Sequence, residues 1–269
     1  MTDHSHSNET VLSETDARGV TSLILNRPEK HNAFDDEMIE RLTNLLKDAI
    51  QNPETKIIVL KANGKNFSAG ADLNWMKSMV QYSEEENMED ALDLGKLMHA
   101  IYHSPKPTIA LVQGKAIGGG VGLVACCQIA IAQDNASFCF SEAKLGIIPA
   151  VISPFIMNAI GPRWTRQYFL TAKAFDAHKA QAIGLCHFLA PPNELEKQAE
   201  EIIDHLLQNG PKALQTINKL INDLCPLPIN DTLLQSTAQL IAKLRVSEEG
   251  QIGISAFLNK TKPKWVTHD

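Results

Sequence analysis

Two segments rich in glycine and alanine carry the residues whose types and spacing could do chemistry. The first, at 66–73, reads NFSAGADL, and the second, at 112–122, reads VQGKAIGGGVG. In each, an apolar run typical of a strand stops at small residues, and a helical pattern follows. Backbone N–H groups at such a strand end and helix start can face one ligand. A pair of donors directed at one carbonyl oxygen forms an oxyanion hole.

An acidic residue follows the glycines in the chain. Glu142 lies in a short segment between the apolar runs around Phe138 and Ile147, where it could act on whatever the hole holds. A glutamate removed from water can serve as general acid or base near neutral pH. The alternative is an acid at a strand end that is exposed to solvent or pairs with Lys144.

Other chemistries suggested by these residue types do not fit the spacing. Gly114-Lys115 lacks a glycine five residues earlier, and Ala116 stands where a phosphate loop needs Ser or Thr. The glycine run does not match G-x-G-x-x-G, and the sequence contains no G-x-S-x-G nucleophile elbow. His99 and His103 are four residues apart but have no third ligand, so we expect no metal site.

Composition excludes several classes of function. The 269 residues are 44% hydrophobic and 21% charged, which is ordinary for one large globular domain. A net charge of -6, without a basic stripe interleaved with aromatics, opposes nucleic-acid binding. Five cysteines without C-x-x-C favour reduced thiols. The sequence has no apolar run of membrane-spanning length and no signal-peptide core at its start, so we expect a cytoplasmic protein without a membrane partner.

The elements that must position the small-residue segments alternate between strands and helices. Runs at Thr10–Glu14 and Val20–Asn26 flank a turn at 16–19 and predict a hairpin. Apolar residues at helical spacing predict a helix over Asp35–Ile50. This βα alternation predicts an α/β fold. It continues with strands at Ile57–Lys61, Thr108–Val112 and Ile129–Ala132, and with helices around Trp75, over Glu85–His103 and after Gly119.

After Pro154 the pattern changes to helices. Their apolar stripes predict burial against the core or another subunit. A short strand at Cys186–Leu189 and the turn at Pro191-Pro192 mark the seam before the last four helices. The predicted helices cover Arg163–Thr171, Ala177–Ile183, Leu195–Leu207, Pro211–Leu224, Ile229–Leu244 and Glu248–Asn259.

Several motifs together resemble one known family. FSAGADL, AIGGGVGL with Glu142 twenty residues past Gly122, and the late SAFLNK are closely similar to the crotonase family, also called the enoyl-CoA hydratase/isomerase superfamily. The resemblance runs from ILNRPEKHNAF to Lys260. It implies a crotonase-like spiral of ββα turns over 1–190. It also implies a helical C-terminal region over 191–269 that builds a homotrimer or a dimer of trimers and covers CoA.

The resemblance also assigns roles to individual residues. It implies that the N–H groups of Ala71 and Gly119 hold a thioester oxygen and that Glu142 moves a proton. Phe257 and Lys260 match a segment that closes over the adenine and 3′-phosphate of CoA, often from a neighbouring subunit. It implies no metal or redox cofactor, because CoA arrives as part of the substrate. The implied substrate- and CoA-binding positions are Lys30, Ala33, Ala69, Ala71, Asp72, Leu73, Gly119, Phe257 and Lys260.

The sequence departs from the family's usual hydratases at one position. Those enzymes carry a glutamate on the glycine-led helix and another twenty residues later, whereas here the first position is Gly122 and only Glu142 remains. A single glutamate resembles the Δ3,Δ2-enoyl-CoA isomerases, in which one carboxylate shuttles a proton between carbons. ADLNWM, GGGVGLVACC and GIIPAVISPF instead resemble the methylglutaconyl-CoA hydratases of leucine catabolism.

These resemblances lead to one expected function and two alternatives. We expect hydration of a branched unsaturated acyl-CoA, with 3-methylglutaconyl-CoA giving 3-hydroxy-3-methylglutaryl-CoA. Lys144, Arg163 and Arg166 are candidate partners for the second carboxylate of such a substrate. The first alternative is an enoyl-CoA isomerase that uses the same hole and Glu142. The second is a catalytically weak scaffold that binds acyl-CoA or associates with RNA.

Overall fold

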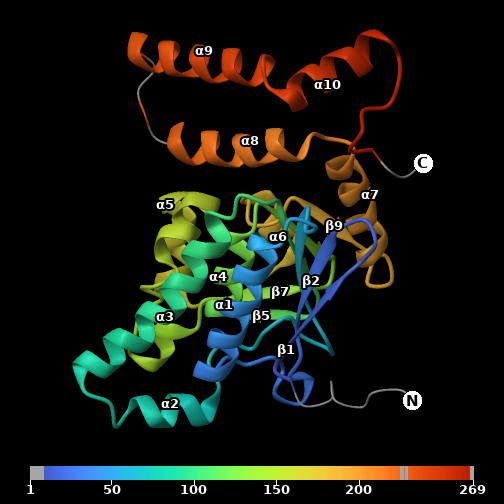
Figure 1. Ribbon diagram of the computed structural model, residues 1–269. Coiled ribbons are helices and arrows are strands. Elements are labelled where there is room, and N and C mark those ends of the chain that lie inside the picture. Colours follow the sequence, from blue (N-terminus) through green and yellow to red (C-terminus); the bar gives the residue numbers. More distant parts are fainter. Residues whose placement is uncertain (1–8, 225–226, 228–229, 267–269) are drawn as a thin grey trace, which may run out of the picture.

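A mixed sheet forms the centre of the molecule (Figure 1). The computed structural model describes residues 9–224, 227 and 230–266. In this part of the chain six strands pair in the order β1-β2-β3-β4-β6-β9. β1 and β2 form the predicted antiparallel hairpin, and every later pair is parallel. The α/β prediction is confirmed. The strands are β1 (Val11–Thr15), β2 (Val20–Leu25), β3 (Ile57–Ala62), β4 (Thr108–Val112), β6 (Ile129–Gln133) and β9 (Phe188–Ala190).

A second, smaller sheet carries the segments in which chemistry was predicted. It consists of β5 (Lys115–Ile117), β7 (Ser137–Cys139) and β8 (Phe175–Asp176), with β7 in the middle. β5 and β8 were not predicted, because strands of two or three residues are too short to show alternation. β5 leads directly into a helix at Gly119, and β7 leads to Glu142.

Several helices begin where the sequence supplies a capping side chain. Asp35 accepts a hydrogen bond from the Met38 N–H at the start of α1. Ser83 and Glu86 form a capping box at the start of α3. The helices of the body are α1 (Asp36–Gln51), α2 (Leu73–Met79), α3 (Glu84–Tyr102), α4 (Gly119–Cys126), α5 (Ser153–Thr171) and α6 (Ala177–Ala182), with short 3-10 turns η2 (Pro28–Lys30) and η3 (Glu142–Leu145).

Both faces of the main sheet are buried. Along β3, Ile58 and Leu60 belong to a core with α1, α3 and α4, whereas Ile57 and Val59 face a second core on the opposite side. Alternate residues of a strand point to opposite faces, so a parallel strand covered on both sides is apolar throughout. Helix α7 (Leu195–Leu207) covers the second face through residues such as Ala199.

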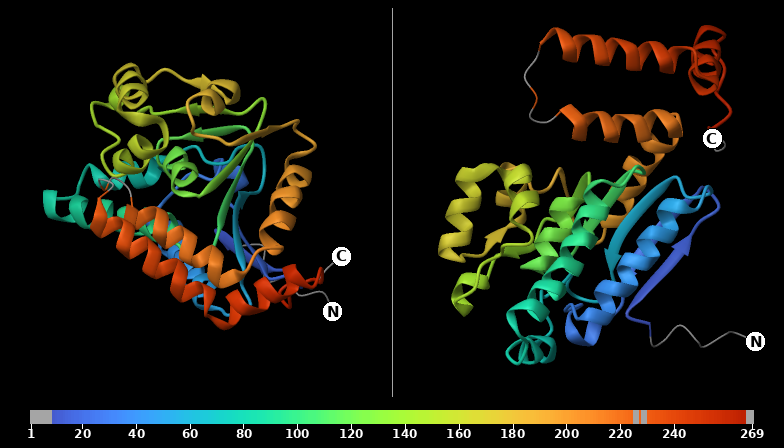
Figure 2. Two further views of the ribbon diagram at one scale, coloured as in Figure 1. Left: turned by 90° about the horizontal axis from the view of Figure 1, so that it is seen from above. Right: turned by 60° about the vertical axis from the view of Figure 1, so that its left-hand side comes forward.

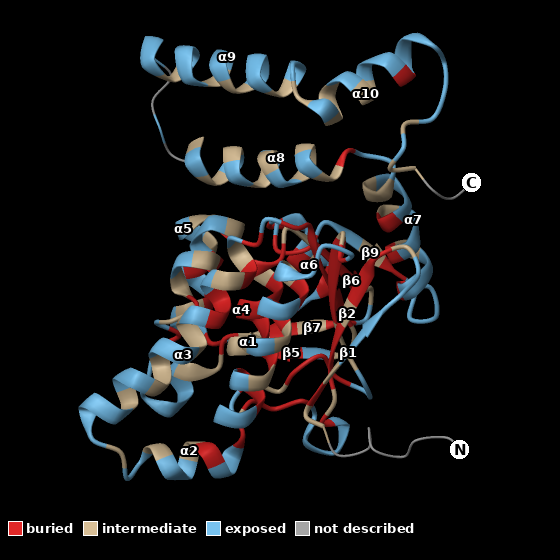
Figure 3. Cartoon of the chain, viewed as in Figure 1, coloured by how far each residue is buried: buried red, intermediate tan, exposed pale blue. Residues whose placement is uncertain are grey.

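The last three helices stand off the body. α8 (Pro211–Leu224), α9 (Asp231–Arg245) and α10 (Glu248–Leu258) form a layered unit above the sheet in Figure 1 and in the right-hand view of Figure 2. They are largely exposed, whereas the buried residues gather in the body (Figure 3). Glu249 holds the unit together, since its carboxylate accepts from the Lys212 and Ala213 N–H groups at the start of α8. The predicted boundary at 190/191 groups α7 with these helices, but α7 packs on the sheet and the projecting unit begins at α8.

Two of the predicted helices differ in their bounds for reasons that the structure shows. The helix predicted over Arg163–Thr171 is the second half of α5, which begins at Ser153 and is interrupted at Gly161, where φ is 73°. The helix predicted from Ile229 begins at Asp231 with Asn230 as its N-cap, and Ile229 itself lies outside the described residues. None of the helices found in the described ranges has the length and apolar character needed to cross a membrane.

Candidate active site

The two small-residue segments run side by side and in parallel. A backbone bridge pairs Ser68 with Ala116, and the Ile117 N–H donates to the Ser68 carbonyl at 2.9 Å. Further along, a Cβ placed on Gly70 would lie 3.1 Å from the Ile117 carbonyl oxygen. The segments that carry the two predicted donor positions, Ala71 and Gly119, are therefore neighbours in the structure, although they are far apart in the chain.

Phe34 joins both segments from a third part of the chain. Its N–H donates to the Gly70 carbonyl at 2.7 Å, and its carbonyl accepts from the Asp72 N–H at 2.7 Å. Its ring reaches the second segment, because a Cβ placed on Gly119 would lie 3.2 Å from the Phe34 Cε2 atom. Phe34 thus fixes the backbone on both sides of Ala71 and packs directly against Gly119.

The N–H groups of Ala71 and Gly119 have no acceptor among the residues that the structure describes. The bridge to Phe34 uses the groups on either side of Ala71. Gly119 is the first residue of α4, and the first N–H groups of a helix have no partner within it. Ala71 is exposed and Gly119 is half-buried. Two free donors on neighbouring, accessible segments could bind one oxygen atom.

The carboxylate of Glu142 lies against Gly118, the residue before Gly119. A Cβ placed on Gly118 would lie 2.9 Å from the Glu142 Oε1 atom, so the carboxylate covers the residue just before Gly119. The pairing of β5 with β7 causes this placement, and the Gly118 N–H donates to the Cys139 carbonyl at 2.9 Å. Gly118 has a φ of 52°, which glycine adopts without strain. A side chain at position 118 would displace the carboxylate.

The Glu142 carboxylate is removed from water and incompletely hydrogen-bonded. Its Oε2 atom is buried and has no partner in the described part of the chain. Burial raises the pKa of Glu142 above its ordinary value, and a backbone hydrogen bond offsets this only in part. A carboxyl group with a raised pKa and a free oxygen is suited to taking up and returning a proton near neutral pH.

Gly122 has no space for a side chain. It is buried one turn into α4, where its N–H donates to the Gly118 carbonyl at 3.2 Å. A Cβ at this position would lie 2.4 Å from the Ile152 Cγ2 atom and 3.0 Å from the Met98 Cε atom. Ile152 is itself only 3% exposed. The immediate surroundings of Gly122 are therefore apolar.

Asp72 anchors the loop that carries Ala71. It is the N-cap of α2 and accepts from the Asn74 N–H at 2.8 Å. It also pairs with Arg27 and Lys30, each at 3.1 Å. Burial alone would raise the pKa of Asp72, but the Asn74 hydrogen bond and the Lys30 ammonium hold it below its usual value. The Asp72 side chain is thus occupied within the fold, while the Lys30 side chain stays 44% exposed beside it.

The remaining predicted CoA positions of this loop differ in accessibility. Ala33 is buried beneath the loop, and Ala69 is half-buried with its N–H donating to the His31 carbonyl at 2.9 Å. Leu73, at the first turn of α2, is 75% exposed. These residues surround Ala71, so the structure groups them with the two donors.

Phe257 and Lys260 lie away from this cluster. Phe257 is 83% exposed on α10, and Lys260 follows the helix with a φ of 54°. α10 stands above the body, at the opposite end from α2, in both side views (Figures 1 and 2). Within one chain these two residues therefore do not approach Ala71.

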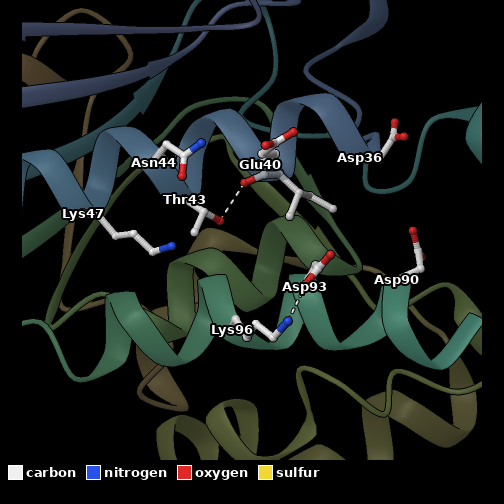
Figure 4. A pocket seen from close by; sticks show the side chains of 9 residues that line it. Asp36, Glu40, Thr43, Asn44, Lys47, Asp90, Asp93 and Lys96 are labelled. Carbon is white, nitrogen blue, oxygen red and sulfur yellow. Dashed lines mark hydrogen bonds and ion pairs between the residues drawn. The ribbon is translucent and has the colours of Figure 1, made fainter.

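A groove of about 540 Å³ lies elsewhere, between α1 and α3. Its lining is largely charged and includes Glu40, Asp90 and Lys96 (Figure 4). The Lys96 ammonium pairs with Asp93 at 2.7 Å within this groove. Neither donor nor Glu142 lines it, so the groove is separate from the candidate active site.

Three residues that shape the site were not singled out from the sequence. Phe34 lies in the recognised ILNRPEKHNAF motif, but the motif does not reveal that its ring reaches Gly119. Asn32, fully buried, accepts from the Arg27 N–H and donates to the Asn63 and Asn66 carbonyls, which ties the loop together. Nothing in the sequence singles out Ile152, because only Gly122, against which it packs, departs from the family's usual hydratases.

Comparison with known proteins settles the family. The model of the enoyl-CoA hydratase/isomerase family matches residues 15–268 of the chain. The chain belongs to this family. The crotonase resemblance is confirmed, and the fold agrees with solved structures of enoyl-CoA hydratase/isomerase proteins.

Related family members cover the whole domain. A Legionella pneumophila structure assigned to enoyl-CoA hydratase/isomerase (crotonase) is 47% identical, with a TM-score of 0.92 over 96% of this chain and 100% of that one. A Thermus thermophilus protein named as an enoyl-CoA hydratase is 32% identical over 91% of this chain and 97% of its own. A mitochondrial Delta(3,5)-Delta(2,4)-dienoyl-CoA isomerase of Dictyostelium discoideum is 27% identical over 94% of this chain and 89% of its own. The family relatives thus include both hydratases and an isomerase.

Proposed function

We propose that this chain is a hydratase of branched unsaturated acyl-CoA esters, with 3-methylglutaconyl-CoA as substrate and 3-hydroxy-3-methylglutaryl-CoA as product. The observation that carries the proposal is the half-buried Glu142 side chain, which lies against Gly118 and has one buried oxygen without a hydrogen-bond partner among the described residues. The next residue, Gly119, and Ala71 on the neighbouring segment have N–H groups that find no acceptor in the same part of the chain. The choice of substrate rests on the resemblance of ADLNWM, GGGVGLVACC and GIIPAVISPF to methylglutaconyl-CoA hydratases.

In the proposed reaction, water adds across the double bond conjugated to the thioester. The Glu142 carboxylate takes a proton from the water, whose oxygen bonds to the β-carbon. The electron pair of the double bond moves toward the thioester oxygen, and the resulting enolate is held by the Ala71 and Gly119 N–H groups. The Glu142 carboxylic acid then returns its proton to the α-carbon. One water molecule is added, and the enzyme is regenerated.

A single carboxylate can serve both steps when the hydroxyl and the proton are added to the same face of the double bond. Asp72, next to Ala71, is already engaged by the Asn74 N–H, Arg27 and Lys30, so it is not free to share this work. Gly122 contributes no side chain. The geometry therefore supports a mechanism that returns to Glu142 for each proton transfer.

The test is turnover of three CoA esters by wild type and by Glu142→Gln. We expect wild type to hydrate 3-methylglutaconyl-CoA faster than crotonyl-CoA and to leave a 3-enoyl-CoA unchanged. Glu142→Gln should lose about 10²–10⁴-fold of that rate while retaining substrate binding. Glu54→Gln, an exposed glutamate outside the site, is the matched control. Nearly full turnover by Glu142→Gln would refute the role of Glu142.

The second candidate function is isomerisation of an enoyl-CoA. It is favoured by the same lone carboxylate, since a proton taken from one carbon of the substrate can be returned to another without any water. The similarity to the Dictyostelium discoideum dienoyl-CoA isomerase also supports it. Turnover of the 3-enoyl-CoA alone, dependent on Glu142, would decide for this candidate.

We also propose that the CoA part of the substrate is bound between two subunits. Lys30 is accessible beside Ala71, whereas Phe257 and Lys260 are exposed at the far end of the same chain. The projecting helices expose apolar side chains, including Ile221, Leu234 and Ile241, which supports packing against another copy in a trimer or a dimer of trimers. No cofactor besides the substrate's CoA is part of the proposal, and the proposed compartment is the cytoplasm.

A further inference from the structure

Two exposed helix faces of this chain carry charges of opposite sign. The first is on α3, where Glu85, Met88, Glu89 and Leu92 form the α3 stripe. Residues that follow one another at intervals of three, four and seven lie on one face of a helix. All four are exposed, and the side chains of Met88 and Leu92 are 57% and 50% accessible.

The second half of α5 has the opposite charge at the same spacing. After the interruption at Gly161, the residues Arg163, Arg166, Gln167 and Leu170 follow at the intervals found on α3 and form the α5 stripe. All four are exposed, and Leu170 is 76% accessible. Each stripe thus presents two charges of one sign beside apolar side chains that a single chain leaves in water.

The charges of both stripes are unpaired within the chain. None of these glutamates and arginines forms an ion pair with another residue that the structure describes. Asp176 is the one acidic residue between Glu142 and Glu194 in the sequence. Its carboxylate caps α6 by accepting from the Lys179 N–H at 2.7 Å. The surroundings of the α5 stripe in the sequence therefore stay basic, although the chain as a whole is acidic.

The two stripes lie at different ends of the body. In Figure 1 the N-terminal half of α3, which carries the α3 stripe, descends toward α2 at the lower left, whereas α5 lies at the upper left beneath α8. The stripes therefore do not meet within one chain. A second copy of the chain supplies the missing counterpart of each, whereas a foreign acidic or basic partner would account for only one of them.

We propose that the α3 stripe of one copy docks on the α5 stripe of another copy, with the glutamates facing the arginines and the apolar side chains packed between them. Such a contact has the apolar centre and charged rim of protein interfaces. Complementary charge fixes which surfaces pair. The contact joins two different surfaces, so it is head-to-tail and leaves each copy with one more stripe of each kind to pair. It is separate from the apolar faces of α8–α10 and does not depend on the reaction at Glu142.

Charge reversal tests the contact in the full chain. Arg163→Glu/Arg166→Glu and Glu85→Arg/Glu89→Arg each place like charges opposite one another. In sedimentation velocity, each double variant should raise the dissociation constant of assembly by at least about tenfold. The four substitutions combined in one chain exchange the two signs, so they should restore most of the wild-type assembly.

Salt dependence separates a lost contact from a damaged fold. Salt screens attraction and repulsion between exposed charges alike. Added sodium chloride should therefore weaken the assembly of wild type and strengthen that of either double variant, which misfolding would not do. The control is Lys47→Glu/Lys197→Glu, which reverses two exposed cations outside both stripes and should assemble like wild type.

Cross-linking locates the contact directly. In Arg166→Lys, a carbodiimide should join the introduced amine to Glu85 or Glu89 of a second, isotope-labelled copy, because it couples amines to carboxylates that touch them. A wild type that stays monomeric, or a sample without this link, would overturn the proposal. So would double variants that assemble like wild type, or a combined variant that assembles no better than either double variant.

Discussion

At the scale of single residues, burial and chemistry conflict at Glu142. One of its oxygens is buried and has no hydrogen-bond partner among the described residues, so this position favours an uncharged side chain over an ionised one. Such a group is destabilising for the fold and is retained where a reaction needs it. The same property that suits Glu142 to proton transfer therefore has a measurable cost in stability.

The direction of the Glu142 pKa shift predicts how the stability of the protein depends on pH. Burial raises the pKa of Glu142 in the folded state above the ordinary 4.5, so the folded protein binds this proton more tightly than the unfolded chain. Ionisation of Glu142 therefore lowers the free energy of unfolding as pH rises from the ordinary pKa through the raised one. We expect the melting temperature of Glu142→Gln, relative to wild type, to increase from pH 4 to pH 7. Thermal unfolding across that range measures it, and a difference that shrinks with rising pH would contradict the prediction.

The raised pKa also predicts the pH dependence of the rate. Glu142 starts the proposed reaction as a carboxylate, which is lost as pH falls through its raised pKa. We expect kcat/KM to fall tenfold per pH unit on an acid limb whose midpoint lies above 4.5. The residual rate of Glu142→Gln should show no such limb. A limb at or below the ordinary glutamate pKa would mean that Glu142 is better solvated than its burial indicates.

At the scale of elements, two loops, at 26–35 and 63–72, together act as a frame for Ala71. Phe34 of the first loop pairs with the backbone around Ala71. Asp72 ends the second loop as the N-cap of α2 and binds Arg27 and Lys30 of the first. The Ala71 N–H is a backbone group, so its position depends on how the neighbouring backbone is held. The ion cluster of Asp72 with Arg27 and Lys30 holds that backbone.

This dependence predicts the effect of Asp72→Asn. Asparagine keeps the cap of α2 but leaves Arg27 and Lys30 without their shared carboxylate. We expect a loss of about 1–3 kcal/mol in the free energy of unfolding at pH 7 and a lower kcat. Because the folded-state pKa of Asp72 is lowered, its contribution is present above its ordinary pKa and is lost as pH falls through the folded value. Urea unfolding of Asp72→Asn and of the exposed Asp93→Asn, with kcat for each, checks this. Equal stability would assign no role to the cluster.

The long helices and strands of this fold can be predicted from the sequence, whereas its shortest strands and its single side-chain contacts cannot. α1 and α7 are readable because an apolar stripe repeats over several turns, and β3 because its run is apolar on both faces. β5 and β8 are too short for any period to appear. The contact of Ile152 with Gly122 joins residues thirty positions apart in sequence number, at a place where neither local propensity nor spacing indicates a neighbour.

At the scale of the whole molecule, the predicted CoA-binding residues divide between two ends of the chain. Ala71 and Lys30 lie in the body, and Phe257 and Lys260 lie on or after the projecting α10 (Figure 1). If both groups touch one CoA, they come from different copies. Each complete site then requires an intact body and an intact C-terminal unit from another chain.

That division predicts complementation between two defective chains. Glu142→Gln lacks the base, and a chain ending at Ser255 lacks Phe257 and Lys260 and should show a raised KM for the CoA ester. The two chains are co-expressed with different tags. In a mixed oligomer, the truncated chain supplies Glu142 and the Glu142→Gln chain supplies the C-terminus, so turnover at low substrate concentration should be restored. Kinetics of the doubly purified species measures this. Rates no greater than the sum of the two separate chains would refute a shared site.

The proposed site combines two segments far apart in the chain, so turnover is a strict reporter of refolding. The segments that carry Ala71 and Gly119 meet through the bridge between Ser68 and Ala116, and Phe34 contacts both. The proposed pair of donors therefore forms only after these long-range contacts have formed. A partly folded chain can therefore regain its helices and still lack the proposed site. Recovered turnover shows that these long-range contacts have formed, whereas recovered helix content alone does not.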